Sequence, residues 1–484
     1  MNKIYNLPSA YKHPEVVTQK LSQESRLGRI AGPYSTLPIP NLVVSPIGIV
    51  PKKDPGKFRM IHHLSYPRGQ SVNSGIDKIF TQVSYHSVDM AIDCILQLQS
   101  GVYFAKTDIE SAFRIIPVHP RDHWLLGFYW DGNYYYDKML PMGLSTSCQV
   151  FEKFSTAIQW AAQNHLNIKH MVHILDDFLI IPPSYQSCSD ALQKFQIMCQ
   201  KVGIPLAPNK TEGPKQVITF AGIELDSICM EARLPLEKLS RYQNLISQSI
   251  KRKRMTLREL QSLAGALNHC CYIVPAGRAF LRRLYDLTSH AKEPHHHIRL
   301  NNNIRTDLQM WNTFLQEFNG KSLFLQQGWH SNQTLNLYTD AAKTVGFGAI
   351  LGNEWFSGIW PSQWKQYDIT ILEFYPIVIA LHLWANKLSN KRIILYTDNE
   401  AVMHILNNNT SKDKALLGLI RALVLQCLKF NIVFRSEHVP GQHNVLADLL
   451  SRSQLQAFYA KAPMANKNPT QIPECLLPNN WSLD

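Results

Sequence analysis

Two adjacent carboxylates lie in the middle of the apolar segment HILDDFLII, residues 173–181. Asp176 and Asp177 are flanked by isoleucine, leucine and phenylalanine, which favour a pair of β-strands. Two neighbouring charges in apolar surroundings are costly unless a cation neutralises them. The segment therefore predicts either a divalent-metal site or a polar hairpin turn, in which Asp is common. No Gly or Asn stands beside the pair, and apolar residues follow at once, which favours the metal site.

A third carboxylate has a similar setting farther upstream. Asp108 ends the segment GVYFAKTD, whose composition predicts a short strand. Three acids held close together can bind two divalent cations roughly 3.5–4 Å apart, which promote in-line attack on phosphorus. Asp108, Asp176 and Asp177 are therefore candidate ligands of Mg²⁺ or Mn²⁺ in a phosphoryl-transfer site.

The first two-thirds of the chain changes character twice. Residues 1–40 are polar and rich in Pro, Ser and Gly, which predicts an extended lead-in. Residues 41–229 open with a hairpin around the turn signal KDPG and then mix strands with helices, which indicates an α+β domain. Residues 230–330 are helical, and TLRELQSLAGAL begins with a capping box of Thr256 and Glu259.

Strands alternate with helices over residues 331–455, which predicts a separate α/β domain. Residues 456–484 are polar and rich in Pro and Asn, so we expect a tail.

Positive charge is concentrated in the first part of the chain. The net charge is +13, from 49 Lys and Arg against 36 Asp and Glu. Residues 331–484 hold 13 basic and 11 acidic side chains, so residues 1–330 carry +11, and residues 231–290 hold 11 basic against 4 acidic. Such a bias predicts a polyanion partner, although a solvated basic surface has the same composition. The run KRKR at 251–254 is open to two further interpretations, an exposed helix face and a nuclear-import signal.

Cysteine and hydropathy patterns bear on the compartment. Nine cysteines, an odd number without a CxxC pair, argue against a disulfide framework and a zinc ribbon. No apolar run approaches the ~20 residues that span a bilayer, and the N-terminus lacks the apolar core of a signal peptide. We expect an intracellular protein of the cytoplasm, the nucleus or both, without a membrane partner.

A second set of acids lies near the C-terminus. Asp340 and Asp398 each end a strand with the letters YTD, whereas Glu373 and Asp448 lie on predicted helices. Four carboxylates that converge would suit two-metal phosphodiester chemistry with water as the nucleophile. Glu373 has a structural alternative, because Thr370 and Glu373 also fit a capping box at the start of their helix.

Six blocks in the first 229 residues resemble, in order and spacing, those of retroelement reverse transcriptases: VSPIGIVPKKDPGKFRMIHHLS, FAKTDIESAFRIIPVHP, LPMGLSTSCQVFEKF, HILDDFLII, GIPLAPNKT and FAGIELD. Among these elements, ILDD and the basic segment ending PAGRAFLRRL are most similar to retrotransposons of the DIRS type. The resemblance implies an α+β right-hand polymerase with fingers, a ferredoxin-like palm and a helical thumb. It also implies that Asp108, Asp176 and Asp177 are the palm metal ligands, with Asp177 the least certain of the three.

The same resemblance implies roles for residues that bind the nucleotide. Lys52 and Arg59 would hold the incoming triphosphate, and Phe113 matches the aromatic residue that excludes a 2′-hydroxyl. Lys210, in PNKT, matches the lysine proposed to protonate the leaving pyrophosphate. Taken alone, each of these residues favours a plainer interpretation, a core position for Phe113 and a solvated surface for Lys52 and Lys210.

Two positions depart from the family pattern. Ile174 stands where Tyr or Phe is common, and Met142 stands before Gly143 where the LPQG block often has Gln. Neither change removes a metal ligand, so the consequence would fall on the rate or fidelity of copying.

The acids Asp340, Glu373, Asp398 and Asp448 resemble the set of the ribonuclease H fold, which implies an α/β ribonuclease H-like domain. That family often has a histidine on a nearby loop, and His438 and His443 both precede Asp448 here. The HHH run at 295–297 has no Cys or Asp beside it, and we expect it to be exposed to solvent.

Together these patterns predict an RNA-directed DNA polymerase with ribonuclease H activity and two Mg²⁺ or Mn²⁺ ions in each active site. Its expected partners are an RNA template, a DNA primer, an RNA–DNA hybrid, dNTPs and other retroelement proteins. No protease, zinc-knuckle or integrase block is visible, so we expect one part of an element's coding capacity. The alternatives are a catalytically silent nucleic-acid scaffold and a sugar-nucleotide transferase, although the transferase leaves the second set of acids unexplained.

Overall fold

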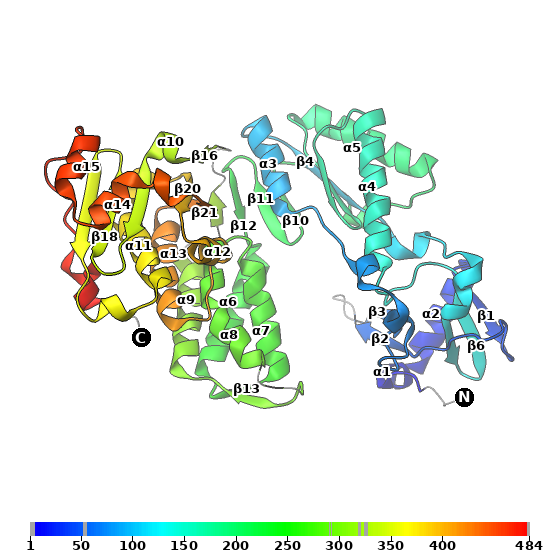
Figure 1. The fold of residues 1–484 in the computed structure, drawn as a ribbon. Helices are drawn as coiled ribbons and strands as arrows, with labels where there is room; N and C mark the ends of the chain where they lie inside the picture. Colours follow the sequence, from blue (N-terminus) through cyan, green and yellow to red (C-terminus); the bar gives the residue numbers. More distant parts are fainter. Residues whose placement is uncertain are drawn as a thin grey trace. The chain divides into compact units, whose positions relative to one another are not determined.

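The computed structural model describes residues 5–51, 56–289, 291, 293–317, 321–323 and 328–481. The chain divides into two compact units, Met1–Ala221 and Gly222–Asp484. Figure 1 traces both units in colours that follow the sequence. The helical segment and the α/β segment predicted from the sequence therefore lie in one compact unit.

The N-terminal segment is helical, so the predicted extended lead-in was wrong. Helices α1 (Pro8–Lys12) and α2 (Pro14–Arg26) each begin with a proline, whose fixed φ suits the first helical position. Ala10, Val17 and Leu21 are buried in a cluster with Ile47 and Phe128. The apolar face is narrow and most other positions are polar, so average composition did not indicate a helix.

Two small sheets complete this part of the first unit. The predicted hairpin around KDPG is present, because β2 (Ile47–Pro51) pairs with β3 (Phe58–His62) in antiparallel register. The other sheet has the order β1-β6-β5. Its strands are β1 (Ile30–Tyr34), β5 (Gly127–Trp130) and β6 (Asn133–Asp137).

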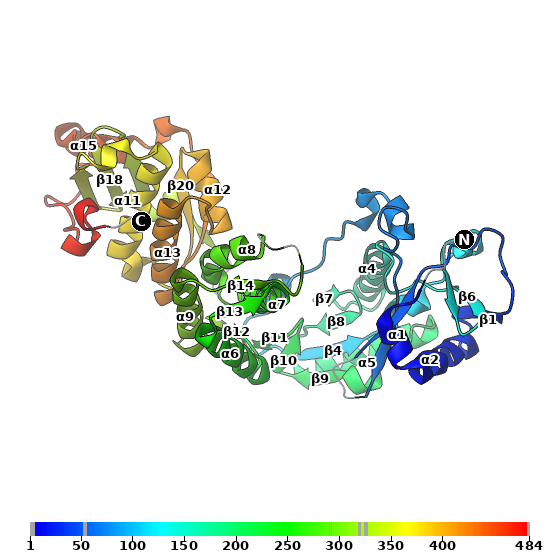
Figure 2. The same ribbon diagram turned by 90° about the horizontal axis from the view of Figure 1, so that it is seen from below.

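The central sheet of the first unit has four strands in the order β7-β8-β4-β9 (Figure 2). These are β4 (Phe104–Asp108), β7 (Met171–Ile174), β8 (Asp177–Ile180) and β9 (Glu212–Lys215). Helices α4 (Ser147–His165) and α5 (Tyr185–Lys201) pack on it through a core that includes Phe151, Phe178 and Phe195. Strand β10 (Val217–Phe220), α3 (Val88–Leu98) and several 3₁₀ turns complete the unit.

A helical bundle begins the second unit. Its helices are α6 (Leu236–Lys251), α7 (Leu257–Cys270), α8 (Arg282–Ser289) and α9 (Asn302–Glu317). The predicted capping box is present: the Thr256 hydroxyl accepts from the Glu259 amide, and the Glu259 carboxylate accepts from the Thr256 amide. Strands β11 (Ile223–Asp226), β12 (Glu231–Arg233) and β15 (Lys321–Leu323) form one antiparallel group, and β13 (Arg254–Thr256) pairs with β14 (His297–Arg299).

The α/β part of the second unit follows the predicted alternation of strands and helices. Strands β17 (Leu337–Ala341), β18 (Gly346–Leu351) and β19 (Glu354–Ile359) form an antiparallel group, whereas β16 (Trp329–His330), β20 (Arg392–Thr397) and β21 (Val433–His438) are parallel. The helices are α10 (Asn332–Leu335), α11 (Ile369–Leu388), α12 (Glu400–Asn408), α13 (Lys414–Lys429) and α14 (Val445–Ser451). Helices α11 and α13 pack against each other (Figure 1).

The last described residues are folded onto this α/β part, so the expected polar tail was also wrong. Helix α15 (Leu455–Lys461) buries Phe458. Two tryptophan indoles donate to backbone carbonyls beyond that helix: Trp355 Nε1 to Asn466 at 2.8 Å and Trp364 Nε1 to Pro478 at 2.9 Å.

Helix α11 corrects the expectation about apolar runs. Within the described part of the chain, this 20-residue helix is long and apolar enough to cross a membrane by length and composition. However, 67% of its most apolar window is buried within the fold, as in the core helix of a globular domain.

Candidate active sites

The first acidic set, Asp108, Asp176 and Asp177, is assembled by three neighbouring strands. Strands β4 and β8 are antiparallel, and their register places Asp108 directly opposite Asp177. Asp176 lies in the two-residue turn between β7 and β8, where Leu175 has a left-handed backbone with φ of 53°. The Ile109 amide donates to the Asp176 carbonyl at 2.9 Å, which fixes the turn beside the end of β4. The structure therefore places all three predicted acids at neighbouring strand ends. In the described part of the chain, however, their ligand atoms do not all lie within 4.8 Å of one another.

Burial makes two of these acids, Asp176 and Asp177, reluctant to ionise. It raises the pKa of Asp177 to about 6 against the opposing charge of Lys106, and the other two acids add to the rise. Burial, followed by the charge of Asp108, also raises the pKa of Asp176. Lys210 Nζ lies 2.8 Å from both carboxylate oxygens of Asp108. The raised pKa values show that the lysines do not fully compensate the acids, and such a donor set fits a divalent cation.

Two predicted nucleotide-binding residues can be placed relative to this set. Arg59 is exposed on β3, and its charge lowers the pKa of Asp176, although burial and Asp108 outweigh it. The half-buried ring of Phe113 packs edge-on against Phe151 with centroids 5.2 Å apart. Lys52 lies outside the described residues.

The loop that contains Met142 and Gly143 is held by β3. Gly143 has φ of 122°, and a Cβ there would lie 2.1 Å from the His62 carbonyl oxygen, so the position requires glycine. The Asn73 side-chain amide donates to the Gly143 carbonyl at 2.8 Å. Met142 is half-buried, and its carbonyl accepts from the His62 amide at 3.4 Å.

A buried polar group behind the β7–β8 turn was not predicted from the sequence. Glu152 on α4 accepts from the Leu175 amide at 3.0 Å, and its other oxygen lies 3.2 Å from His173 Nε2. His173 Nδ1 lies 2.5 Å from Gln159 Oε1. Burial raises the pKa of Glu152 and lowers that of His173 to about 4, which disfavours an ion pair between them. Within the described part of the chain, His173 Nε2 has no hydrogen-bond partner. The sequence does contain one indication of this group, because His173 is a polar residue within an apolar predicted strand.

The second acidic set consists of Asp340, Glu373, Asp398 and Asp448, and three of its members converge. Asp340 lies on β17, Glu373 on α11 and Asp398 immediately after β20. Their ligand atoms all lie within 4.8 Å of one another. Elements that are separate in sequence thus form one candidate metal site.

Hydrogen bonds and burial define the state of this site. Ser451 Oγ donates to Asp340 at 2.5 Å, and the Asn444 amide lies 3.4 Å from its other oxygen. Burial raises the pKa of Asp340 to about 6, although the Ser451 bond opposes the shift. Burial, followed by the charges of Asp340 and Asp398, raises the pKa of Glu373 to about 9. The site therefore disfavours full ionisation without a cation, and its oxygen donors fit Mg²⁺ or Mn²⁺.

Asp448 lies near this cluster without joining it. Its carboxylate accepts from Nε of Arg452, the C-cap residue of α14, at 2.7 Å, and its charge contributes to the raised pKa of Asp340. His438 Nε2 lies 3.2 Å from the Asp398 carbonyl oxygen, whereas His443 is exposed in a 3₁₀ turn. His438 therefore has a defined contact with the backbone of one member of the acidic set.

The capping alternative for Glu373 was wrong. The N-cap of α11 is Asp368, whose carboxylate accepts from the Thr370 amide at 2.9 Å. Glu373 is instead directed to the acidic cluster, because its position one turn into the helix faces the ends of β17 and β20.

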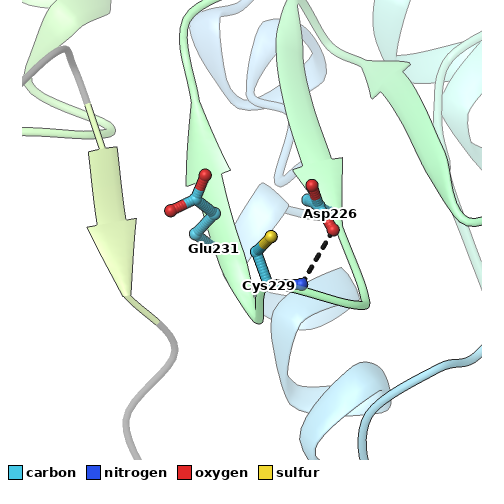
Figure 3. Close-up of side chains that lie close together, drawn as sticks. All are labelled: Asp226, Cys229 and Glu231. Carbon is cyan, nitrogen blue, oxygen red and sulfur yellow. Dashed lines mark hydrogen bonds between the residues drawn. The ribbon is translucent and has the colours of Figure 1, made fainter.

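A third group of ligand-type side chains belongs to the β11–β12 hairpin. Asp226, Cys229 and Glu231 have ligand atoms within 4.8 Å of one another, and the Cys229 amide donates to Asp226 (Figure 3). Arg233 Nη1 lies 2.9 Å from Asp226 and 2.5 Å from Glu231, so a cation is already present. The charge of Asp226 also raises the pKa of the Cys229 thiol, which disfavours the thiolate needed for ligation. This group stabilises the hairpin.

The exposure of the HHH run agrees with the sequence prediction, because His295, His296 and His297 are all exposed. Among the described residues, neither group of side chains that could hold a metal ion includes them.

Residues 50–225 match the family model described as reverse transcriptase (RNA-dependent DNA polymerase), so the chain contains a reverse transcriptase domain. The enzymatic polyprotein of carnation etched ring virus is 23% identical over 407 residues, covering 79% of this chain and 54% of the relative. The Tf2-3 transposon polyprotein of Schizosaccharomyces pombe is 24% identical over 434 residues, covering 84% and 29%. The chain thus spans about half the length of its viral relative and less of the transposon protein.

A solved structure has the same fold. The foamy viral protease-reverse transcriptase in complex with an RNA/DNA hybrid aligns with a TM-score of 0.52 and 17% identity. The alignment covers 90% of this chain and 55% of that chain. The predicted fold class, a right-hand polymerase followed by an α/β ribonuclease H-like domain, is confirmed. The likeness to the DIRS type is not tested by these comparisons.

Proposed function

We propose that this protein is an RNA-directed DNA polymerase that also cleaves the RNA strand of RNA–DNA hybrids. One observation carries the proposal: two separate carboxylate clusters occur in a chain that contains a reverse transcriptase domain. Each cluster includes at least one acid whose pKa is raised to about 6 or above, Asp177 in the first and Asp340 and Glu373 in the second. Phosphoryl transfer is the chemistry that most often uses such metal-dependent acid clusters.

The first acidic set would join deoxynucleotides to a DNA primer on an RNA or DNA template. The primer hydroxyl would attack the α-phosphorus of the dNTP, forming a phosphodiester bond while the bond to pyrophosphate breaks. Arg59 would offset triphosphate charge, and Lys210 would donate a proton to the pyrophosphate. Phe113 would limit the space beside the sugar and so exclude a 2′-hydroxyl.

The second acidic set would direct water onto a phosphodiester of the RNA strand. Asp340, Glu373 and Asp398 would hold the metal, with Asp448 at the edge of the site. In both sites two Mg²⁺ or Mn²⁺ ions would activate the attacking oxygen and neutralise charge on the leaving oxygen. The chain's own residues would supply the ligands and the surrounding hydrogen bonds.

The biological setting is also part of the proposal. The ILDD block and the segment ending PAGRAFLRRL support an origin in a DIRS-type retrotransposon. We infer an intracellular location in the cytoplasm, the nucleus or both, with other proteins of the element as partners. Template, primer, hybrid and dNTPs would be its substrates.

The proposal is tested by separating the two activities in the full chain. With Mg²⁺ or Mn²⁺, the unmodified protein should extend a DNA primer on an RNA template and cut the RNA of a hybrid. Asp176→Asn should lower synthesis by more than about 100-fold, the upper range for mutations that only support a ligand, and should spare cleavage. Asp340→Asn should have the reciprocal effect.

Each variant carries its own folding control. Retained cleavage in Asp176→Asn and retained synthesis in Asp340→Asn would each show that the variant is folded. A protein that binds hybrids tightly yet shows neither activity with either metal would instead be a silent scaffold. Loss of both activities in both variants would contradict the assignment of separate sites.

A further inference from the structure

An open, strongly basic hollow lies at one end of the helical bundle in the second unit. It has a volume of about 590 Å³ and lies between β13, β14 and the start of α9. Figure 1 shows β13 at the end of the bundle opposite β12. Among the described residues, four cationic side chains line the hollow, Lys253, Arg254, Arg299 and Arg305, and no acidic side chain does.

Two of these cations face each other on paired strands. The antiparallel register of β13 and β14 makes Arg254 and Arg299 direct cross-strand partners, and both are exposed. Like charges in this position destabilise a strand pair. Within the described part of the chain, neither guanidinium has a carboxylate partner, whereas the adjacent Arg252 is paired with Glu259 at 2.8 Å. The uncompensated pair is therefore a position at which an anion would relieve repulsion.

The other lining residues, Arg305 and the asparagines at 301–303, supply hydrogen-bond donors. Arg305 is anchored by hydrogen bonds from its guanidinium to the carbonyls of Ile250 at 3.2 Å and Arg252 at 2.7 Å. Residues 301–303 are three exposed asparagines at the first turn of α9, and all three line the hollow. Asparagine amides and a helix N-terminus both donate to phosphate oxygens.

The lining also indicates which part of a ligand it can hold. Of the described residues that line it, Leu300 alone is apolar, and none carries an aromatic ring on which a nucleobase could stack. The hollow could bind the phosphates of a free nucleotide but offers no stacking partner for its base. A nucleic-acid strand fits better, because its phosphates can enter the hollow while its bases lie outside.

The structure also bears on the alternatives for KRKR. Lys251 ends α6, and Arg254 is committed to a strand pair in which Leu300 N donates to the Lys253 carbonyl at 3.1 Å. The run therefore does not form one helix face, because it passes from the end of α6 into β13 with all four side chains exposed.

We propose that this hollow binds consecutive backbone phosphates of a nucleic-acid strand, without reading its sequence. The identity of the ligand as nucleic acid rests on the proposed function. Because the hollow would bind phosphates alone, every sequence should bind similarly, and binding should depend strongly on salt.

The test compares the full-length protein with the double variant Arg254→Gln/Arg299→Gln. Binding to a short DNA duplex is measured by fluorescence anisotropy, without divalent metal, between about 50 and about 200 mM salt. The slope of log affinity against log salt should become shallower by about 1.8, or about 0.9 for each phosphate that the variant no longer neutralises. Over this fourfold salt range, the affinity ratio of wild type to variant should change by about tenfold. Several unrelated duplex sequences should give the same result.

The matched control is Lys461→Gln/Lys467→Gln, which removes the same charge from exposed positions elsewhere in the second unit. It should leave the slope nearly unchanged. Thermal unfolding of the arginine double variant should occur at the same or a higher temperature, because a repulsive cross-strand pair is removed. Weakened binding would then not be explained by misfolding.

Three outcomes would overturn the inference. The slope could remain unchanged in the arginine double variant, or it could fall equally in the lysine control. Alternatively, tripolyphosphate could bind the wild type but not the double variant while the duplex slope stays constant, which would assign the hollow to a free polyphosphate. If the wild type synthesises DNA but the arginine double variant has an unchanged salt slope, only the proposed phosphate binding in the hollow is rejected. If the double variant shows the expected slope change but the wild type has neither synthesis nor cleavage activity, only the proposed function is rejected.

Discussion

Glu373 is the most perturbed acid of the second acidic set. It lies on an otherwise apolar helix, and burial together with Asp340 and Asp398 raises its pKa to about 9. A carboxyl with such a pKa is mainly protonated near neutral pH when no cation is bound. Metal binding at this position is therefore coupled to proton release.

This coupling predicts how pH affects stability. Between the ordinary pKa near 4.5 and the folded-state value of about 9, folded Glu373 retains a proton that the unfolded chain releases. Stability of the metal-free protein should therefore fall as pH rises across that window. Glu373→Gln should remove much of this fall and raise the unfolding temperature at high pH, by about 2–4 °C for each kcal/mol recovered. Thermal unfolding from pH about 5 to about 9 in a chelator measures it.

Glu400→Gln is the matched control, because Glu400 is exposed at the start of α12. It should leave the pH dependence unchanged. Addition of Mg²⁺ should stabilise the wild type more at high pH than at low pH. Equal pH dependence in wild type and Glu373→Gln would contradict a raised pKa at this residue.

At the scale of elements, the β7–β8 hairpin depends on a support that lies outside it. Its two-residue turn holds Leu175 in a left-handed conformation, which is unfavourable for a residue with a bulky side chain. Glu152, from α4, bonds the Leu175 amide and contacts His173. We infer that Glu152 is a positioning residue for Asp176 and Asp177.

Two substitutions of Glu152 should separate positioning from charge. Glu152→Gln supplies an acceptor for the Leu175 amide and a donor for His173, so synthesis should remain close to wild type. Glu152→Leu leaves the Leu175 amide without its acceptor, which costs about 1–3 kcal/mol. Primer-extension kinetics should then show a lower kcat with little change in the KM for dNTP, while hybrid cleavage is retained. Equal loss in both variants would indicate that the negative charge matters.

At the scale of the molecule, one buried acid connects the helical bundle to the α/β part of the second unit. Asp307 on α9 lies 3.3 Å from Arg283 of α8 and 2.8 Å from Arg421 of α13. Arg421 also lies over the ring of Phe280, 4.9 Å from its centroid. Burial raises the pKa of Asp307 more than the two arginines lower it, so each partner matters to the balance.

Removal of this acid should weaken the whole second unit. Asp307→Ala leaves two partly buried arginines facing each other, and breaking a buried ion pair costs about 3–5 kcal/mol. Thermal unfolding should show a lower midpoint, and addition of Arg421→Met should recover part of the loss. Asp286→Ala, which removes an exposed i,i+4 partner of Arg282, is the control and should cost less than about 1 kcal/mol. Similar losses in the two single variants would reject the connecting role.

Local sequence alone determined the elements and the acids. The hairpin around Asp176 and Asp177, the two YTD strands and the capping box at Thr256 depend on apolar runs and near neighbours, which a sequence displays directly. The order and spacing of the blocks also indicated the polymerase fold, because such motifs keep their order along the chain. Two helices near the N-terminus were missed because a narrow apolar face is hidden in a polar average.

Tertiary structure decided which residues meet and in what state. The pairing of Asp108 with Asp177, the support from Glu152 and the opposition of Arg254 and Arg299 all join positions distant in sequence. The choice of Asp368 over a capping box at Thr370 depended on where α11 begins. The pKa of Glu373 depended on burial among acids from other elements. Sequence specifies local preferences, whereas contact, burial and charge compensation exist only after distant segments pack together.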